Sequence, residues 1–338
     1  MTNSPSTTTT SNTSRQDQVE NELVIAKALT VEELDVDIYR NSEELWHPAG
    51  SRGAFGGQIS LVAQALRAAW HTVPEKLHVH VNTTITIEHS LHNYFLVPGR
   101  SDIPAIYKVR RVRDGRSFAT RVVTCTQQGK TVIVCICSFT NFNTTGESLD
   151  HQIPMPSNIP KPEDLPTDSE RMKVLATDPR IPEKIRNHFE INLKVEIPID
   201  YRDLRIDTPE EFIRGSTEPN GHQGQWFKTQ ERLPENDPAL HACSIAYASD
   251  RGILMAAVRA NGLVARRGIS MMASIDHSMW FHAPARADEC PRSNDGRGTA
   301  FGRIYNREGV LVATCAQEGI MRLSQSEQDK RRPNINKL

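Results

Sequence analysis

Two histidines stand in matching sequence settings, and histidine is the side chain best suited to chemistry near neutral pH. His89 lies in an Ile-Glu-His-Ser stretch and His277 in an Ile-Asp-His-Ser stretch. Such an imidazole either forms a structural hydrogen bond or contacts a substrate. Because a residue that recurs at one position of a repeated pattern has a role set by the fold, we favour the structural hydrogen bond and keep substrate contact as the alternative.

The usual metal and nucleophile motifs do not occur in the sequence. His78 and His80 alternate in a strand-like stretch and so share one face, but a zinc site needs a third and a fourth ligand, and none follows at a suitable spacing. A Gly-rich phosphate loop and a Gly-x-Ser-x-Gly nucleophile elbow are also absent. We therefore predict no metal and no cofactor, and we expect no α/β-hydrolase fold.

Three further polar residues carry little information by spacing alone. Asp250 precedes a helical-looking stretch, so it is either a helix N-cap or a general base. Ser274 and Gln317 lie in strand-like stretches, where a polar side chain is ordinary. Residue type and spacing leave the roles of all three open.

The first half of the chain reads as one helix followed by a series of strands. The paired glycines Gly56 and Gly57 suit a tight turn into an amphipathic helix over residues 59–70. Alternating apolar stretches then predict strands at 77–90, 105–112, 117–126 and 131–139. Asp-Gly at 114–115 and Gln-Gly at 128–129 are hairpin signals. The order predicts an antiparallel sheet curled around a central helix, the hot-dog arrangement.

The second half repeats the first. The histidine stretches are related by an offset of 188, the Asp-Gly-Arg triplets at 114–116 and 295–297 by 181, and Val132 and Cys135 match Val312 and Cys315 at an offset of 180. Three matches in one order indicate an internal duplication. The second central helix is then predicted at residues 251–260.

The falling offset shows that the second copy is shorter by seven residues between His277 and Asp295. Residues 286–294 lack a strand pattern, and Pro291 removes a backbone donor. Either one strand of the second sheet is shortened there, or the chain has lost a piece.

Composition gives the boundaries of these units. The Ser-, Thr- and Asn-rich start predicts a disordered tail, and a Pro-rich acidic stretch after residue 142 predicts a linker, with a helix over 171–190. The predicted organisation is a disordered tail (1–20), a first unit (21–142), a linker with a helix (143–200), a second unit (201–322) and a C-terminal tail (323–338).

Charge and hydropathy limit the partners. The net charge is −1, so the chain lacks the basic excess typical of nucleic-acid binding. The longest apolar run, 131–139, is far shorter than the ~20 residues that a membrane helix needs, and no secretory signal is predicted. Six scattered cysteines fit buried thiols in a reducing compartment. The C-terminal Asn336, Lys337 and Leu338 are close to the Ser-Lys-Leu peroxisomal signal, so we predict the peroxisome and its import receptor, with the cytoplasm as the alternative.

At this point the sequence resembles the type II acyl-CoA thioesterases, the bacterial and peroxisomal double hot-dog family. Three segments of each half carry the resemblance: 55–58, 89–99 and 113–118, then 247–250, 275–282 and 317–322. It covers roughly residues 24–322, and the shortened stretch near Pro291 is the main departure. The resemblance implies an α+β double hot-dog fold, with two antiparallel sheets each wrapped on a helix, and a homodimer or higher homo-oligomer.

The resemblance also implies an activity, the hydrolysis of fatty acyl-CoA to free acid and CoA by an oriented water. Its catalytic residues fall on Asp250, Ser274 and Gln317 by motif position, with Ser at 274 within the range of the family. As substrate-binding residues we predict His89 and His277, together with Gly57 and Gln58, where backbone N–H groups would face the thioester carbonyl.

Two alternatives remain at the level of sequence. Hot-dog folds also host hydration and dehydration of enoyl thioesters, although the three polar residues favour hydrolysis. A non-catalytic acyl-CoA-binding protein is the other alternative, because the second copy is shortened. Peroxisomal fatty-acid metabolism and the tailoring of an acyl-derived product would use the same hydrolysis.

Overall fold

The computed structural model describes residues 23–43, 45, 57–74, 86–141, 151–220, 222–264, 268–283, 292–294 and 299–331. The predicted tail 1–20, His78, His80, Pro291 and the last three residues lie outside these ranges. Within them, no helix is long and apolar enough to cross a membrane.

The first unit wraps an antiparallel sheet around one long helix, α3 (Gly57–His71), which contains the predicted amphipathic stretch. The sheet and a short preceding helix comprise α2 (Val24–Leu29), β1 (Val31–Asp35), β2 (Ile38–Asn41), β3 (Thr86–Phe95), β4 (Ile106–Asp114), β5 (Phe118–Gln127) and β6 (Lys130–Asn141). The hairpin signal at Gln128 and Gly129 is confirmed: both residues have positive φ, 49° and 76°, as a two-residue turn between twisted strands requires. Residues 77–85 of the first predicted strand lie outside the described residues, and the described part, β3, continues to Phe95, beyond the predicted end at residue 90.

The second unit repeats this plan. Its central helix is α7 (Pro238–Ser249), which is followed at once by α8 (Ile253–Ala260). Its other elements are β7 (Ile199–Asp203), α6 (Pro209–Arg214), β8 (Gly224–Thr229), β9 (Ile269–Ser274), β10 (Asp276–Phe281), β11 (Arg292–Asn294), β12 (Thr299–Tyr305), β13 (Leu311–Leu323) and the terminal helix α9 (Gln325–Arg331). The double hot-dog fold is therefore confirmed.

The helix predicted at 251–260 is present as α8, which contacts β12 and β13, but the preceding helix, α7, was not predicted. α7 lies upstream of it, and its side chains are buried on nearly every side, from Ala239 to Ser249. A helix that is apolar all round has no amphipathic period, so the pattern that revealed α3 is missing. Asp250 consequently follows the central helix as its C-cap, and it is not an N-cap: that position before α8 belongs to Gly252.

In agreement with a shortened strand, Arg292–Asn294 form β11, which pairs with β12 and β8, and the residues on either side of it, 284–291 and 295–298, lie outside the described residues. Two smaller expectations change. The single helix predicted over 171–190 is two helices, α4 (Asp168–Thr177) and α5 (Glu183–Asn192), because Pro179 and Pro182 interrupt it. The predicted C-terminal tail contains the last residue of β13 and all of α9.

The linker runs along the second unit. After the short turn η2 (Pro162–Asp164) it leads into α4, and before that turn it contacts β8 and β12. The indole of Trp226 donates to the Pro160 carbonyl at 2.9 Å, and the hydroxyl of Tyr305 donates to the Ile153 carbonyl at 3.0 Å. These bonds attach the linker to the second sheet.

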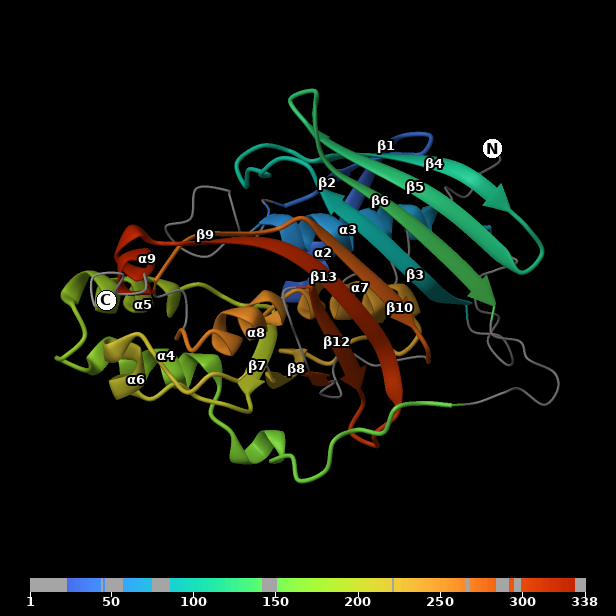
Figure 1. Cartoon of the computed structure of the whole chain (residues 1–338). Coiled ribbons are helices and arrows are strands. Elements are labelled where there is room, and N and C mark those ends of the chain that lie inside the picture. Colours follow the sequence, from blue (N-terminus) through green and yellow to red (C-terminus); the bar gives the residue numbers. More distant parts are fainter. Residues whose placement is uncertain are drawn as a thin grey trace, which may run out of the picture.

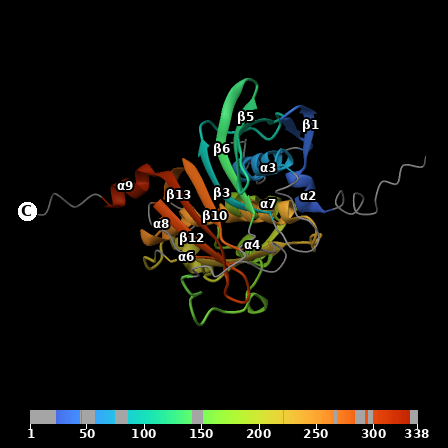
Figure 2. The ribbon, with the colours of Figure 1, turned by 90° about the vertical axis from the view of Figure 1, so that its right-hand side faces the viewer.

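The two sheets join into one. β3 of the first unit pairs antiparallel with β10 of the second, with Met279 opposite Leu91, so a continuous sheet passes through both units. α3 and α7 lie together against one side of it (Figure 1, Figure 2). Arg67 near the end of α3 donates two 2.9 Å bonds to Asp237, the N-cap of α7, so the two helices run antiparallel.

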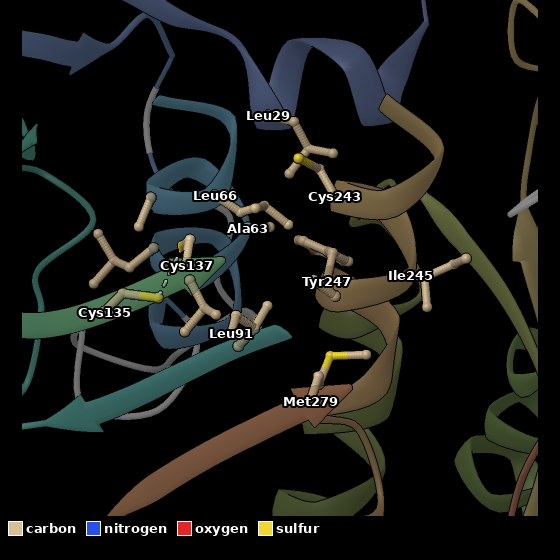
Figure 3. Close-up of a cluster of buried hydrophobic side chains, with 14 of the residues drawn as sticks. Leu29, Ala63, Leu66, Leu91, Cys135, Cys137, Cys243, Ile245, Tyr247 and Met279 are labelled. Carbon is tan, nitrogen blue, oxygen red and sulfur yellow. Dashed lines mark hydrogen bonds between the residues drawn. The ribbon is translucent and has the colours of Figure 1, made fainter. Parts of the chain in front are cut away.

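The space between these helices and the sheet is the hydrophobic core. Leu66 of α3, Tyr247 of α7 and Leu91 of β3 all meet there (Figure 3). The five cysteines within the described residues are all buried free thiols, which confirms that prediction for them. Both units thus share one core at their junction.

Candidate active site

The structure brings Asp250, Ser274 and Gln317 together. The side-chain amide nitrogen of Gln317 donates one hydrogen bond to Asp250 Oδ1 and one to Ser274 Oγ, each at 2.5 Å. The bonded pairs are separated by 67 and 43 residues along the chain. Gln317 is buried, whereas Asp250 and Ser274 are partly exposed. A buried amide therefore holds a carboxylate and a hydroxyl that a ligand can reach.

Asp250 is positioned by the turn between α7 and α8. Gly252 in this turn has a φ of 86°, a conformation that L side chains rarely adopt, and it lets the chain reverse directly into α8. The carboxylate therefore projects at a junction of two helices: it terminates α7 and precedes the N-terminus of α8 by two residues.

Gln317 and Ser274 are positioned by a change of partner along β13. The first part of β13 pairs with β10 and the last part with β9, and Gln317 lies between the two. At that point Ile275 N–H donates to the Glu318 carbonyl at 2.8 Å, and Asp276 Oδ1 accepts from Glu318 N–H at 2.7 Å. These bonds fix the break between β9 and β10, and so place Ser274 beside Gln317.

His277 holds the amide of Gln317 from behind. Its Nδ1 lies 3.1 Å from Gln317 Oε1, and its Nε2 lies 2.9 Å from Ser249 Oγ. Because a carbonyl oxygen can only accept, Nδ1 carries the proton. Burial lowers the pKa of His277, although Asp250, the bond to Gln317 and Asp276 act in the opposite direction. A neutral imidazole with protein partners on both nitrogens favours the structural hydrogen bond over substrate contact.

Arg251 anchors the turn that carries Asp250. Its guanidinium forms ion pairs with Asp168 and Asp203, donates to Gln225 at 2.7 Å, and lies 4.2 Å above the ring of Tyr201. In return, Gln225 donates to the Arg251 carbonyl at 2.8 Å. The backbone next to Asp250 is thereby tied to β7, β8 and α4.

The other predicted substrate-binding residues lie elsewhere. His89 is exposed, and its ring makes an edge contact with Phe118. It lies at one end of the β3–β10 pair, and Asp276 lies at the other end. Gly57 and Gln58 form the start of α3, and their backbone falls within the described residues. These three assignments stay predictions.

The first unit does not reproduce the cluster. At the offset of 180 residues that relates the two sheets, the counterpart of Gln317 is Cys137, a buried thiol. Within the described residues, no group of three His, Cys, Asp or Glu side chains could hold a metal ion. The sequence indicated a structural hydrogen bond for His277 but not its partners, and it did not indicate the role of Arg251, because these partners are distant in the chain.

Comparison with known proteins shows the family to which the chain belongs. Residues 43–140 match the family described as acyl-CoA thioesterase N-terminal domain, and residues 164–321 match the acyl-CoA thioesterase C-terminal domain. The chain therefore belongs to the acyl-CoA thioesterase family and is a thioester hydrolase.

Particular relatives span nearly the whole chain. This chain is 37% identical to acyl-coenzyme A thioesterase 8 of Mus musculus, over 89% of both chains. It is 24% identical to peroxisomal acyl-coenzyme A thioester hydrolase 1 of Saccharomyces cerevisiae, over 80% of this chain and 86% of the relative. Among solved structures, the acyl-CoA thioesterase II TesB2 of Mycobacterium marinum has a TM-score of 0.62 and 31% identity, covering 89% of this chain and 99% of that one.

Proposed function

We propose that Asp250, Ser274 and Gln317 are the catalytic residues and that they hydrolyse a fatty acyl-CoA with an oriented water. The observation that carries this proposal is the pair of hydrogen bonds from Gln317 to Asp250 and Ser274. Both hydrogens of the Gln317 amide are used, so this residue fixes the spacing of the other two. Ser274 Oγ accepts from Gln317, which leaves its O–H available to a water.

The reaction then follows from the positions of the groups. Asp250 accepts a proton from the water while the oxygen of the water attacks the thioester carbon. The carbon–sulfur bond breaks in the tetrahedral intermediate, and the CoA thiolate leaves with its electron pair. A thiol with a pKa of about 8.5 is a good leaving group, so no strong acid is needed. Asp250 returns its proton to the thiolate, and the acyl group leaves as a carboxylic acid.

The start of α3 is the proposed oxyanion site. Since α3 and α7 run antiparallel, Gly57 and Gln58 lie at the end of the helix pair where α7 delivers Asp250. Backbone N–H groups in the first turn of a helix have no partner within the helix and carry its positive partial charge. They would stabilise the negative oxygen of the tetrahedral intermediate.

The decisive experiment is thiol release from a saturated acyl-CoA, followed with Ellman's reagent, for the wild type and for Asp250→Asn. The variant keeps the size of the side chain but cannot accept the proton, so we expect kcat to fall by about 10²–10⁴ with little change in KM. Equal rates for the two proteins would contradict the assignment of the base.

The same assay separates the alternative functions. An enoyl thioester hydratase does not release CoA from a saturated substrate, and a binding protein releases none from any substrate. Glu235→Gln is a suitable control, because Glu235 is an exposed residue that forms an ion pair with Arg232. That variant should keep the rate of the wild type.

We also propose import into the peroxisome through Asn336, Lys337 and Leu338. The support is the near match of this C-terminus to Ser-Lys-Leu and the relative from Saccharomyces cerevisiae that is named as peroxisomal. Peroxisomal fatty-acid metabolism is the corresponding pathway, and the tailoring of another acyl product in the cytoplasm is its alternative.

A homodimer or higher homo-oligomer completes the proposal. The outer face of the continuous sheet exposes large apolar side chains, among them Tyr94, Ile136, Trp280 and Phe301. They belong to four strands, β3, β6, β10 and β12, that lie on both sides of the joint between the units. Exposed apolar side chains on a broad sheet are typical of a surface that associates with another protein, here a second copy.

A further inference from the structure

Asn93 is a buried amide without a partner. It lies near the end of β3, the residue is 1% exposed, and neither its Oδ1 nor its Nδ2 makes a hydrogen bond within the described part of the chain. Burying an amide without a hydrogen bond is costly, and such groups are rare in proteins. Its presence here needs an explanation.

The fold does not require an amide at this position. The offset of 188 that relates the two histidine stretches also relates Asn93 to Phe281, which is buried and apolar. The same structural position is thus filled by a hydrocarbon in the second unit. The neighbours of Asn93 on the inner face of β3 and β6, Leu91 and Cys135, are likewise buried.

Asn93 belongs to the same row of the sheet as the active site. It lies directly opposite His277 in the β3–β10 pair, and His277 bonds Gln317 on β13. The strand order is β3, β10, β13, so Asn93 and Gln317 are two strand spacings apart, about 10 Å. An acyl chain held at Gln317 and extending under β10 would reach Asn93 several carbons from the thioester.

His277 itself cannot satisfy the amide. Its two ring nitrogens already bond Gln317 and Ser249. Two other buried hydroxyls of this layer, Ser60 Oγ on α3 and Tyr247 Oη on α7, interact with each other. Asn93 is left with both of its polar atoms unpaired within the described residues.

We propose that Asn93 determines substrate specificity, and that its amide binds an oxygen on the acyl chain several carbons from the thioester. This inference rests on the proposed acyl-CoA hydrolysis. The preferred substrate is then an acyl-CoA with a hydroxyl or oxo group in the chain. A purely saturated chain is accepted less well, because it leaves both polar atoms of Asn93 unpaired.

The test compares octanoyl-CoA with the hydroxyoctanoyl-CoA isomers, in which the hydroxyl moves from beside the thioester to the chain end. For the wild type we expect one isomer, with its hydroxyl in the middle or outer part of the acyl chain, to show a kcat/KM at least about tenfold above that of octanoyl-CoA. In Asn93→Leu, which has a similar volume but no amide, we expect this ratio to fall at least about tenfold, chiefly through KM. If the leucine variant folds poorly, Asn93→Ala replaces it, and we expect the ratio to change in the same direction.

Cys135→Ala is the matched control, because Cys135 is the buried neighbour of Asn93 on β6, away from the active site. It should keep the preference of the wild type. A wild type that hydrolyses all isomers at the rate of octanoyl-CoA, or an unchanged ratio in both Asn93 variants, would overturn the inference while leaving the hydrolysis intact. No thiol release from any of these substrates would instead contradict the proposed function.

Discussion

The side-chain amide of Gln317 can adopt two orientations, and only one of them supports the proposed reaction. When the amide nitrogen faces Asp250, it donates a hydrogen bond to the carboxylate. If the amide oxygen faced Asp250, the two oxygens would repel each other. The Asp250 carboxylate can only accept, so it requires the first orientation, and His277 holds the amide there because its Nδ1–H then meets Gln317 Oε1. In the proposed mechanism the histidine therefore acts on the reaction through a neighbour, as a positioning residue.

His277→Leu should therefore reduce kcat far more than it changes KM. The apolar variant removes the donor that orients Gln317, and a small displacement of a positioned group can cost about 10² in rate. Steady-state kinetics with octanoyl-CoA measure both parameters. His282→Phe is the control: His282 follows the same strand but is exposed and bonds Thr314, so its loss should leave both parameters near the wild type. A large change in KM alone for His277→Leu would point to substrate contact instead.

The three proposed catalytic residues could be placed by resemblance but not by spacing. Asp250 and Gln317 are 67 positions apart and come together only through a helix terminus and a change of strand partner. No local pattern marks such a meeting. For the same reason the sequence did not reveal that Asn93, in the other unit, lies in the row of the active site.

At the scale of elements, the α7–α8 turn depends on a buried ion-pair network. Arg251 and Arg171 both pair with Asp203 of β7, whose side chain is 8% exposed. Burial alone would raise the pKa of Asp203, but the two arginines outweigh burial and lower it. The network links α4, which the sequence assigned to a linker, to the residue that follows Asp250.

Stability should consequently fall in acid through Asp203. A carboxyl group whose pKa is lower in the folded than in the unfolded protein stabilises the fold above its unfolded pKa of about 3.9, and this contribution is lost as the pH falls through the folded value. We expect Asp203→Asn to lower the free energy of unfolding by about 1.5–3 kcal/mol at pH 7, and the difference from the wild type to shrink below a pH of about 4.

Urea unfolding at a series of pH values measures this difference. Glu32→Gln is the control, because Glu32 forms an ion pair with Arg40 in which both side chains are nearly half exposed. Exposed pairs contribute about 0–1 kcal/mol, so this variant should follow the wild type at every pH. A constant gap between Asp203→Asn and the wild type down to a pH of about 2 would contradict the proposed linkage.

At the scale of the whole molecule, the duplication was visible in the sequence but the joint was not. The offsets of 188, 181 and 180 show two related halves, and each half folds as a helix with an antiparallel sheet. The pairing of β3 with β10 joins strands nearly 190 residues apart, and no turn or local pattern specifies it. The two units therefore form one sheet and one core where the sequence indicated two units connected by a linker.

A shared core predicts a single unfolding transition. Leu66 lies between α3 and α7 with its side chain fully buried (Figure 3), so Leu66→Ala leaves a cavity in the interface of both units. Such a change costs about 2–5 kcal/mol, and we expect calorimetry to show one transition that moves as a whole to lower temperature. Leu34→Ala, an equal truncation at an exposed position of β1, should move it little. If Leu66→Ala instead separated two transitions and shifted only one, the units would fold independently, and Asn93 of the first unit would be held less firmly against the active site of the second.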